Sequence, residues 1–387
     1  MTDRTTDELY LRQAFALARQ GIALTSPNPS VGAVIVDPNG TVVGSGFHEY
    51  SKTKHAEIVA LERAGERARG ATIYVNLEPC VHHGRSGPCT EAIISSGITR
   101  VVASMKDPNP LVGGKGFQRL RDAGIAVSSG ILEEEAATLN EAFAKYIRHK
   151  TPLVTLKAAM TLDGKIAPPA GGENKWVARD RSEAGREWIT GETARSHVQE
   201  LRHQHDAILT GVGTVIVDDP LLTDRTGRPR RRPLLRVILD SQLRIPIESR
   251  IVKTAADDVL VICSSSDEHK KQALQERGVR VQQIASSGAR SRPTFSAVAE
   301  LLGKLEITSL IIEGGSLINE DALASGVVDK VFLFYAPMIL AGTGGVPFAS
   351  GDGFPSLRHA PHVKSLRLHR FGDDFAVEGY LRDPYCD

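Results

Sequence analysis

His55-Ala56-Glu57, followed by Pro79-Cys80 and Cys89, is the motif that best indicates the fold and chemistry of the first part of this chain. One histidine and two cysteines form a ligand set that suits Zn²⁺, and three protein ligands leave a fourth position open for water. Glu57 lies two residues beyond the histidine, so its carboxylate can carry protons instead of binding the metal. The sequence therefore predicts a catalytic metal site with His55, Cys80 and Cys89 as ligands.

The order of these residues is that of a known chemical class. The pattern H-x-E…P-C-x-x-C is typical of zinc-dependent nucleobase deaminases, but here eight residues, 81–88, separate the two cysteines. A structural zinc would usually show a fourth protein ligand, and His82 and His83 are the candidates for it. Both histidines could instead line a substrate pocket or lie in a solvated loop, and plain free cysteines are a further alternative.

Composition limits the possible classes of protein. The 387 residues allow two or three domains, and 47 basic against 46 acidic residues argue against a nucleic-acid partner. The basic run 228–233 contains prolines and no aromatic residue, so a solvated loop is the preferred interpretation. Four cysteines favour a reducing compartment. No apolar signal segment and no stretch of about 20 apolar residues is present, which predicts a cytoplasmic protein with no membrane partner.

Hydrophobic patterns predict alternating helices and strands over the first 150 residues. We expect helices at 7–21, 55–65 and 89–97, and strands at 31–36, 41–46, 71–77, 101–104 and 126–127. The first two strands flank the turn at 37–40 and should form a hairpin. This alternation predicts a layered α/β domain, with both parts of the metal site at helix N-termini, where the helix dipole favours thiolate.

A charged helix at 133–149 leads to Lys150-Thr151-Pro152, where we place the boundary between domains 1–150 and 151–387. The second domain should also be α/β. We expect strands at 153–159, 207–209, 236–239, 259–263, 310–312 and 331–336. We expect helices at 193–204 and 296–305. Two glycine-bearing stretches, 210–214 and 313–319, each follow a strand. Such a stretch before a helix can cradle a phosphate, although it is as often a simple strand-to-helix turn.

The motifs of the first domain together resemble a known family. They are Pro27-Asn28-Pro29-Ser30-Val31-Gly32, the zinc motif with its eight-residue gap, and Asp107-Pro108-Asn109-Pro110. These look like the deaminase half of the bifunctional riboflavin biosynthesis deaminase/reductases. The resemblance implies a cytidine-deaminase-like three-layer domain that binds one Zn²⁺ through His55, Cys80 and Cys89. It implies Glu57 as proton donor, and 2,5-diamino-6-(5-phosphoribosylamino)pyrimidin-4(3H)-one as the substrate that loses ammonia. Asn28 is a candidate donor to the pyrimidine edge, or alternatively a turn residue between prolines.

The second domain resembles the reductase half of the same family. The similarity lies in 157–165, 211–215, 218–220, 240–241 and 313–315. It implies a dihydrofolate-reductase-like α/β domain that uses NADPH to convert the ribosyl chain to a ribityl chain. The implied NADP contacts are Ala159, Thr214, Asp218, Ser241, Gly315, Ser316, Leu317, Ile318, Asn319, Glu320 and Asp321. The implied substrate contacts are Asn174, Arg202, Leu222, Arg225 and Glu313.

Some of these residues have a plain chemical interpretation. Arg202 and Arg225 suit a 5-phosphate, because a guanidinium binds phosphate oxygens at two points; a surface salt bridge is the alternative for either. Lys157 and Asp218 are candidates to polarise the carbonyl of the opened sugar. The chain departs from the family at 177–188, which looks like an insertion, so either Trp176 or Trp188 is expected to contact NADP.

Two rival functions use the same motifs. A nucleoside or tRNA deaminase with an appended binding domain would keep the zinc motif and bind no NADPH. A degenerate, zinc-stabilised binding module would have no need of Glu57. The family resemblance further implies a small-molecule substrate and a homo-oligomer, a dimer or larger.

Overall fold

The structure, a computed structural model, describes residues 4–82, 87–169, 188–265, 267–284 and 292–386. The chain divides into two compact units. The first contains Met1–Lys150 together with Pro229–Arg232, and the second contains Thr151–Arg228 and Pro233–Asp387. Both units are mixed α/β structures, and each is described by itself.

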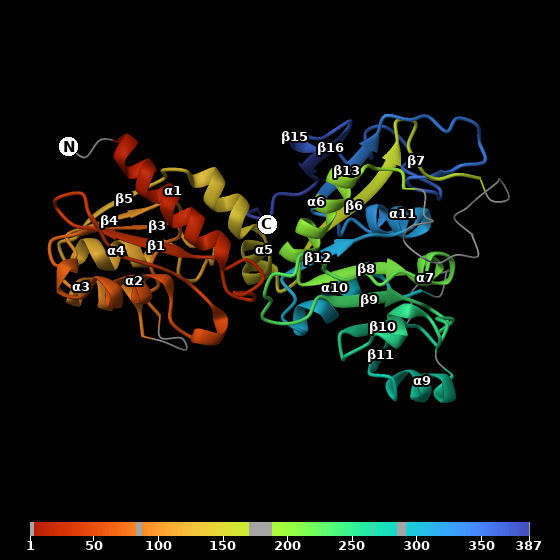
Figure 1. Cartoon of the computed structure of the whole chain (residues 1–387), viewed down its shortest axis with the longest axis horizontal. Helices are drawn as coiled ribbons and strands as arrows, with labels where there is room; N and C mark the ends of the chain where they lie inside the picture. Colours follow the sequence, from red (N-terminus) through yellow and green to blue (C-terminus); the bar gives the residue numbers. More distant parts are fainter. Residues whose placement is uncertain (1–3, 83–86, 170–187, 266, 285–291, 387) are drawn as a thin grey trace. The chain divides into compact units, whose positions relative to one another are not determined.

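A five-stranded sheet of order β2-β1-β3-β4-β5 forms the centre of the first unit (Figure 1). Its strands are β1 (Gly32–Val36), β2 (Val42–Phe47), β3 (Thr72–Val75), β4 (Arg100–Ala103) and β5 (Ala126–Ser129). β1 is antiparallel to β2 and to β3, whereas β3, β4 and β5 are parallel. The expected hairpin is confirmed, and its turn ends at Gly40, whose φ of +82° suits glycine.

Helices cover both faces of this sheet. They are α1 (Arg4–Gln20), α2 (Ala56–Ala64), α3 (Cys89–Ser95), α4 (Lys115–Asp122) and α5 (Glu133–His149), with short 3₁₀ turns at Tyr50–Lys52 and Gly65–Ala68. In Figure 1, α1 and α5 lie on one face and α2, α3 and α4 on the other. The three-layer prediction for this unit is therefore confirmed.

Two glycines of β2 set the position of α2. A Cβ at Gly44 would lie 2.2 Å from the carbonyl oxygen of Ala60, and one at Gly46 would lie 2.7 Å from Cβ of Val59. Both distances are far below a van der Waals contact, so only glycine lets the helix backbone lie this close to the strand. The N-terminus of α2, which carries the candidate metal ligand His55, is held at a fixed height over the sheet as a result.

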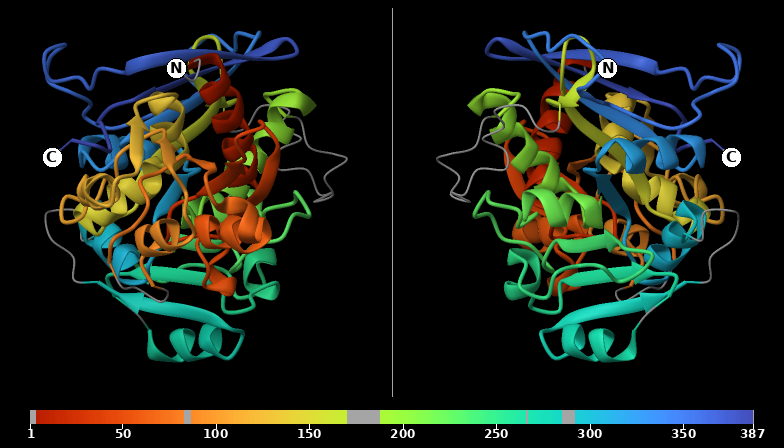
Figure 2. Two further views of the ribbon diagram at one scale, coloured as in Figure 1. Left: turned by 90° about the vertical axis from the view of Figure 1, so that its left-hand side faces the viewer. Right: turned by 90° about the vertical axis from the view of Figure 1, so that its right-hand side faces the viewer.

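The second unit is built on a nine-stranded sheet of order β11-β10-β9-β8-β12-β6-β13-β16-β15, beside a two-stranded pair, β14-β7. β11 and the β15–β16 hairpin lie at opposite edges of the larger sheet (Figure 2). Strands from β11 to β13 run parallel, and β16 and β15 are antiparallel. The strand bounds are β6 (Leu153–Thr161), β7 (Lys165–Ala167), β8 (Ala207–Gly211), β9 (Leu235–Leu239), β10 (Val259–Cys263), β11 (Val279–Gln283), β12 (Ser309–Ile312), β13 (Lys330–Ala336), β14 (Val346–Pro347), β15 (Lys364–Phe371) and β16 (Asp374–Tyr380).

Strand side chains alternate between two apolar cores, one on each face of the sheet. In β10, Val261 belongs to one core and Leu260 and Ile262 to the other, which explains the uninterrupted apolar runs of these strands. The first core is covered by α6 (Glu192–Gln204), α7 (Val212–Asp218), α8 (Arg250–Lys253) and α9 (Glu268–Gln275). The second is covered by α10 (Phe295–Lys304) and α11 (Ser316–Ala324).

Most of the expected elements are present, and the differences have physical causes. The stretch at 210–214 is not a loop, because α7 begins at Val212 directly after β8. β15 was not predicted, and its side chains are mostly exposed, so it carries no apolar stripe that a pattern could detect. The short helix α4 was also missed, and its few buried residues include only two large apolar side chains, Phe117 and Leu120.

Candidate active sites

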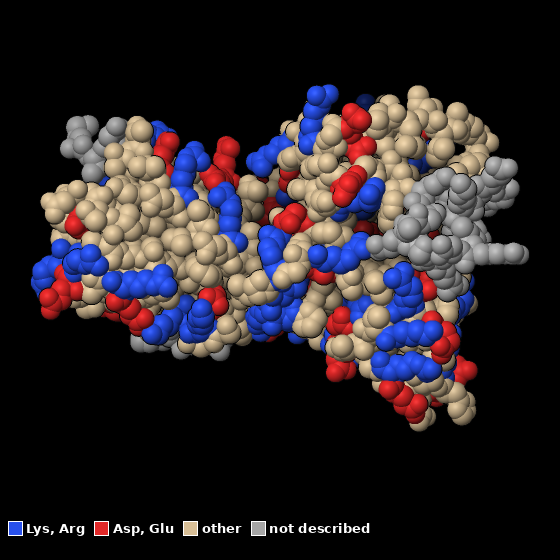
Figure 3. Space-filling model, in the orientation of Figure 1, with Lys and Arg blue, Asp and Glu red and all other residues tan. Residues whose placement is uncertain are grey.

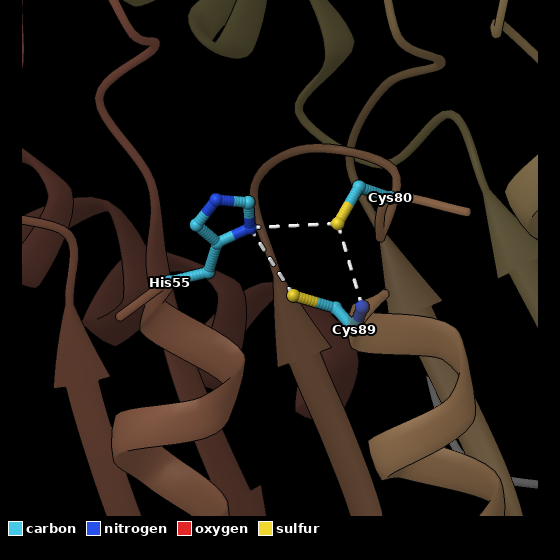
Figure 4. Close-up of side chains that lie close together, drawn as sticks. All are labelled: His55, Cys80 and Cys89. Carbon is cyan, nitrogen blue, oxygen red and sulfur yellow. Dashed lines mark hydrogen bonds between the residues drawn. The ribbon is translucent and has the colours of Figure 1, made fainter. Parts of the chain in front are cut away.

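His55, Cys80 and Cys89 come together in the first unit, as the sequence predicts. The Nδ1 atom of His55 lies 3.5 Å from Sγ of Cys80 and 3.3 Å from Sγ of Cys89, and the three ligand atoms lie within 4.8 Å of one another. Figure 4 shows the imidazole nitrogen facing both sulfurs. His55 is the N-cap of α2, and Cys89 is the first residue of α3.

These residues fit a zinc ion. With Zn–S and Zn–N bonds of about 2.3 and 2.0 Å, the edges of a tetrahedral site measure about 3.5 to 3.8 Å, close to the nitrogen–sulfur distances found here. The Cys89 thiol and the hydrogen bonds from His55 and from the backbone N–H of Cys89 outweigh burial and lower the pKa of Cys80 to about 4. The thiolate is the form of cysteine that binds metal, and the lowered pKa favours this form.

Within the described residues, the metal-ligand cluster contains three members and does not include His82, which is exposed. His83 lies outside the described residues. A cluster of three ligands matches a site with an open position better than the four-ligand structural zinc that we considered as an alternative.

Glu57 lies in the first turn of α2, with only 3% of its surface exposed. Burial raises its pKa above the ordinary value, and the neighbouring His55 opposes that rise. The carboxyl group is thus a buried acid next to the cluster and outside the metal-ligand set. This environment favours proton transfer over metal binding.

Asn28 is oriented by a histidine that the sequence analysis missed. Nδ2 of Asn28 lies 3.0 Å from Nε2 of His48, and Nδ1 of His48 lies 2.9 Å from the carbonyl oxygen of Lys54. The His48 ring also meets the ring of His55 edge-on, with centroids 5.3 Å apart. His48 directly follows β2, and no motif marks it in the sequence. These contacts favour a site role for Asn28 over that of a turn residue.

Glu78 fixes the chain around the metal-ligand cluster. Its two carboxylate oxygens accept hydrogen bonds from the backbone N–H groups of Asp107, Gly114, Gly116 and Phe117, at 2.7 to 3.1 Å. A Cβ at Gly116 would lie 2.2 Å from the carbonyl oxygen of Pro79. The start of α4 is therefore packed directly against the strand end that delivers Cys80.

The second unit contains a large cleft of about 1810 Å³. It lies along the carboxyl ends of β8, β9, β10 and β12 and beside β6, the place where open α/β sheets bind their ligands. The N-termini of α7 and α11 border it. Backbone N–H groups and the positive end of a helix dipole suit a pyrophosphate at such a position.

Most of the residues expected to bind NADP or substrate line this cleft. They are Lys157, Ala159, Trp188, Arg202, Thr214, Asp218, Arg225, Ser241, Glu313, Gly315, Ser316, Leu317, Ile318, Glu320 and Asp321. Two expected residues do not. Leu222 packs in an apolar core, and Asn319 is fully buried, with its Nδ2 donating to the carbonyl oxygen of Phe348 at 2.8 Å. Asn174 and Trp176 lie outside the described residues, so the choice between Trp176 and Trp188 stays open.

Glu313 is the centre of a buried ion cluster in the cleft. Nε and Nη2 of Arg202 lie 2.7 and 3.0 Å from its two oxygens, and Nζ of Lys157 lies 3.4 Å from Oε2. Burial opposes ionisation of Glu313, but Arg202 and Lys157 outweigh it and lower the pKa of Glu313 to about 2. The carboxylate therefore stays charged at neutral pH and holds both cations in place.

The C-terminal half of α6 holds the segment that carries Arg225. Nη1 of Arg202 donates to the carbonyl oxygen of Thr223 at 3.1 Å, and the backbone N–H of Arg225 donates to Oε1 of Gln199 at 3.0 Å. Between them, Nδ1 of His203 lies 2.8 Å from Oδ2 of Asp224. These contacts fix the backbone from which the Arg225 side chain reaches the cleft.

Comparison with known proteins gives matches to both units. Residues 152–377 match the family described as the RibD C-terminal domain, and residues 4–105 match the cytidine and deoxycytidylate deaminase zinc-binding region. The riboflavin biosynthesis protein RibD of Actinobacillus pleuropneumoniae is 41% identical over 98% of this chain and 96% of its own. RibD of Aquifex aeolicus is 40% identical over 97% of this chain and 98% of its own.

Solved structures agree with these matches. RibD of Acinetobacter baumannii has a TM-score of 0.81 at 34% identity, covering 98% of this chain and 99% of its own. The diaminohydroxyphosphoribosylaminopyrimidine deaminase/5-amino-6-(5-phosphoribosylamino)uracil reductase of Thermotoga maritima has a TM-score of 0.79 at 34% identity, covering 97% and 99%.

Proposed function

This chain belongs to the RibD family of riboflavin biosynthesis proteins, and on that premise we propose that it catalyses two successive steps of riboflavin biosynthesis. The first step is hydrolytic deamination of 2,5-diamino-6-(5-phosphoribosylamino)pyrimidin-4(3H)-one, which releases ammonia. The second is NADPH-dependent reduction of the ribosyl chain of the product to a ribityl chain. The observation that carries this function is the presence of a His/Cys/Cys cluster and of a dinucleotide-sized cleft in one chain.

We assign the deamination to residues 1–150. His55, Cys80 and Cys89 would hold Zn²⁺, which would supply a Lewis acid able to activate water. Buried Glu57 carries a proton to the ring nitrogen and then to the departing amine. Asn28, oriented by His48, holds the edge of the pyrimidine. Water adds its oxygen to the ring carbon and ammonia leaves, so a carbonyl replaces the amino group.

We assign the reduction to residues 151–387. NADPH supplies the hydride when it is bound in the cleft. Lys157 and Asp218 face the carbonyl of the opened sugar and polarise it, while Arg225 binds the 5-phosphate. The sequence suggests Arg202 as a second phosphate partner, but its Nε and Nη2 are directed at Glu313. We therefore propose that Arg202 holds Glu313 toward the substrate.

The rival function of a nucleoside or tRNA deaminase with an appended binding domain is not favoured, because the second unit matches the RibD C-terminal domain. We propose that nucleic acid is not a partner. In support, basic and acidic side chains are interspersed on the face shown in Figure 3, and the chain has a formal net charge of +1.

Among the described residues, no helix combines the length and the apolarity that a membrane span requires. We propose a cytoplasmic location, supported by four free cysteines, two of which are metal ligands.

We also propose a homo-oligomer formed through the edge strand β15. Leu366 and Leu368 of this strand are 55% and 71% exposed, and an open strand edge readily pairs with another. Light scattering on the protein and on a Leu368→Lys variant tests this assembly; a monomer in both would contradict it.

The test of function is incubation of the zinc-loaded protein with the diaminopyrimidine ribotide and NADPH, with products identified by mass. We expect ammonia, NADP and the ribityl product to form. With the dinucleotide omitted, the deaminated ribosyl compound should accumulate. Release of ammonia from cytidine or tRNA, with the ribotide left unchanged, would overturn the proposal.

A further inference from the structure

A short segment from late in the sequence is part of the first unit. Residues Pro229–Arg232 belong to that unit, although the chain before and after them belongs to the second. We call these four residues the arm. They form a loop, as the basic run predicts, but the side chains of Arg231 and Arg232 are only partly exposed. Both side chains are bonded to residues of the first unit.

The arm binds the loop that carries Asn28. The backbone N–H of Arg231 donates to the carbonyl oxygen of Ala23 at 2.9 Å. The Nη1 atom of Arg231 donates to the carbonyl oxygen of Ser26, and Nη2 of Arg232 lies 3.2 Å from Oγ of the same serine. Because Asn28 follows Ser26 by only two residues, the arm holds the main chain immediately before it.

The same arginine also contacts the segment that carries His48. Cζ of Arg231 lies 3.6 Å from the centroid of the Tyr50 ring, so the guanidinium stacks on the aromatic face. The backbone N–H of Tyr50 donates to the carbonyl oxygen of Leu24 at 3.1 Å. Tyr50 follows His48 by two residues. One side chain therefore contacts both segments from which the Asn28–His48 pair projects.

Two buried amides hold the chain on the other side of Asn28. Oδ1 of Asn140 accepts the backbone N–H of Ser30 at 2.8 Å, and Nδ2 of Asn76 donates to the carbonyl oxygen of Ser30 at 2.9 Å. Oδ1 of Asn76 also accepts the N–H of Gly32 at 2.9 Å. The loop is thus fixed after Asn28 by residues of the first 150, and before Asn28 it is held by the arm.

We propose that Arg231 is a positioning residue for the deamination. By binding Ser26 and stacking on Tyr50, it keeps the loop and the His48 segment at the separation at which Asn28 can bind the edge of the pyrimidine. This rests on the proposed function and extends the deaminase site beyond residues 1–150. Arg231 acts through Asn28, so its effect is on the placement of the substrate.

The first test measures deamination of the diaminopyrimidine ribotide by the unaltered protein, Arg231→Ala and Arg231→Lys. We expect Arg231→Ala to lower kcat/KM about 10-fold, the size of one lost hydrogen bond. The loss should lie mainly in KM, because Asn28 binds the substrate before the reaction as well as during it. Zinc should stay near one ion per chain, and Arg231→Lys should recover part of the loss.

The matched control is Arg228→Ala, which removes a cation of the same basic run that pairs with Glu200 at the surface. It should deaminate as the unaltered protein does. Oxidation of NADPH with the deaminated ribosyl compound supplied directly should be unchanged in Arg231→Ala. A lower melting temperature of Arg231→Ala with an unchanged KM would mean that the arginine only stabilises the fold, and would overturn the proposal.

A double variant tests whether Arg231 acts through Asn28. In an Asn28→Ala background, Arg231→Ala should cost little more in kcat/KM, because the group that it positions is already absent. A full further 10-fold loss in that background would show an independent action and would overturn the positioning role.

Hydrogen exchange followed by mass spectrometry tests the arm without any reaction. The amides of residues 24–30 should exchange faster in Arg231→Ala than in the unaltered protein, and at the unaltered rate in Arg228→Ala. Unchanged exchange in Arg231→Ala would show that the arm does not hold the loop. Failure of the unaltered protein to release ammonia from the ribotide would instead count against the proposed function, and the exchange rates would still decide whether Arg231 holds the loop.

Discussion

Arg202 of α6 and Glu313 at the end of β12 form a two-point ion pair, with Nε 2.7 Å from Oε1 and Nη2 3.0 Å from Oε2. Their side chains are only 12% and 11% exposed. The pair joins a helix to the carboxyl end of a central strand. It therefore organises the second unit as well as the cleft.

Removal of one partner should destabilise the second unit strongly. Arg202→Met leaves a buried carboxylate supported only by Lys157, and loss of one member of a buried pair costs about 3 to 5 kcal/mol. The double variant Arg202→Met/Glu313→Leu should be more stable than Arg202→Met alone. Urea unfolding followed by tryptophan fluorescence measures this, because both tryptophans of the chain, Trp176 and Trp188, belong to the second domain. Equal stability of Arg202→Met and the unaltered protein would contradict the role of the pair.

The same pair gives a defined pH dependence. The pKa of Glu313 is lowered from 4.5 to about 2 by Arg202 and Lys157, so at intermediate pH the unfolded chain binds the proton more readily than the folded one. The stabilisation, about 3 kcal/mol for such a shift, is complete above pH 4.5 and is lost as the pH falls toward 2. Urea unfolding at several pH values should show a steeper acid loss for the unaltered protein than for Glu313→Gln. If the free energy of unfolding fell in parallel with pH in both proteins, Glu313 would not be the source of the pH dependence.

Glu57→Gln should separate catalysis from metal binding. The substitution removes the proton carrier but no ligand, so zinc should remain near one ion per chain while ammonia release falls about 10²- to 10⁴-fold. Elemental analysis and an ammonia assay measure the two quantities. Glu62→Gln, an exposed residue of the same helix paired with Lys54, is the control and should behave as the unaltered protein. Retained deamination in Glu57→Gln would exclude the assigned role.

Cys89→Ala should abolish zinc binding, because two remaining ligands do not complete a zinc site. The control is Cys263→Ala, which changes a buried cysteine of β10 in the second unit. This variant protein should keep its zinc. Zinc content after dialysis is the measurement. Full occupancy in Cys89→Ala would mean that another residue binds the metal.

Glu78→Gln should loosen the segment 107–117 around the metal-ligand cluster. The variant keeps one oxygen acceptor for four backbone N–H groups, and each buried group left without a partner costs about 1 to 3 kcal/mol. We expect a lower melting temperature of the first unit and faster loss of zinc to a chelator. Glu91→Gln, which breaks only the exposed pair with Arg119, should have little effect. Similar results for the two variants would show that Glu78 has no special role.

The sequence predicted the metal site well, because three ligands and a carboxylate carry their chemistry in their identity and spacing. His48 could not be found in this way, since its role depends on a contact between Asn28 and a histidine 20 residues away. In the second unit, the buried strands β6, β8, β9, β10, β12 and β13 were recognised from their apolar runs, whereas β11 and β16 were missed. β15 was missed because it lies at a sheet edge and shows mostly exposed side chains.

The sequence was less informative about which residues line the cleft of the second unit. Family resemblance placed Asn319 among the cofactor contacts, but the structure buries it and directs its amide to Phe348.

The hydrogen bonds that the Glu78 carboxylate accepts all come from main-chain nitrogens and from no side chain of the segment that they hold. Exposed residues such as Leu111 can therefore be exchanged without weakening the attachment. A change in the length of the segment is different, because it would move the N–H groups of Gly114 and Gly116 out of register with the carboxylate. We expect exposed non-glycine positions of this segment to accept substitutions and the segment to accept insertions poorly. Gly116 must stay, because a Cβ there would lie 2.2 Å from the carbonyl oxygen of Pro79.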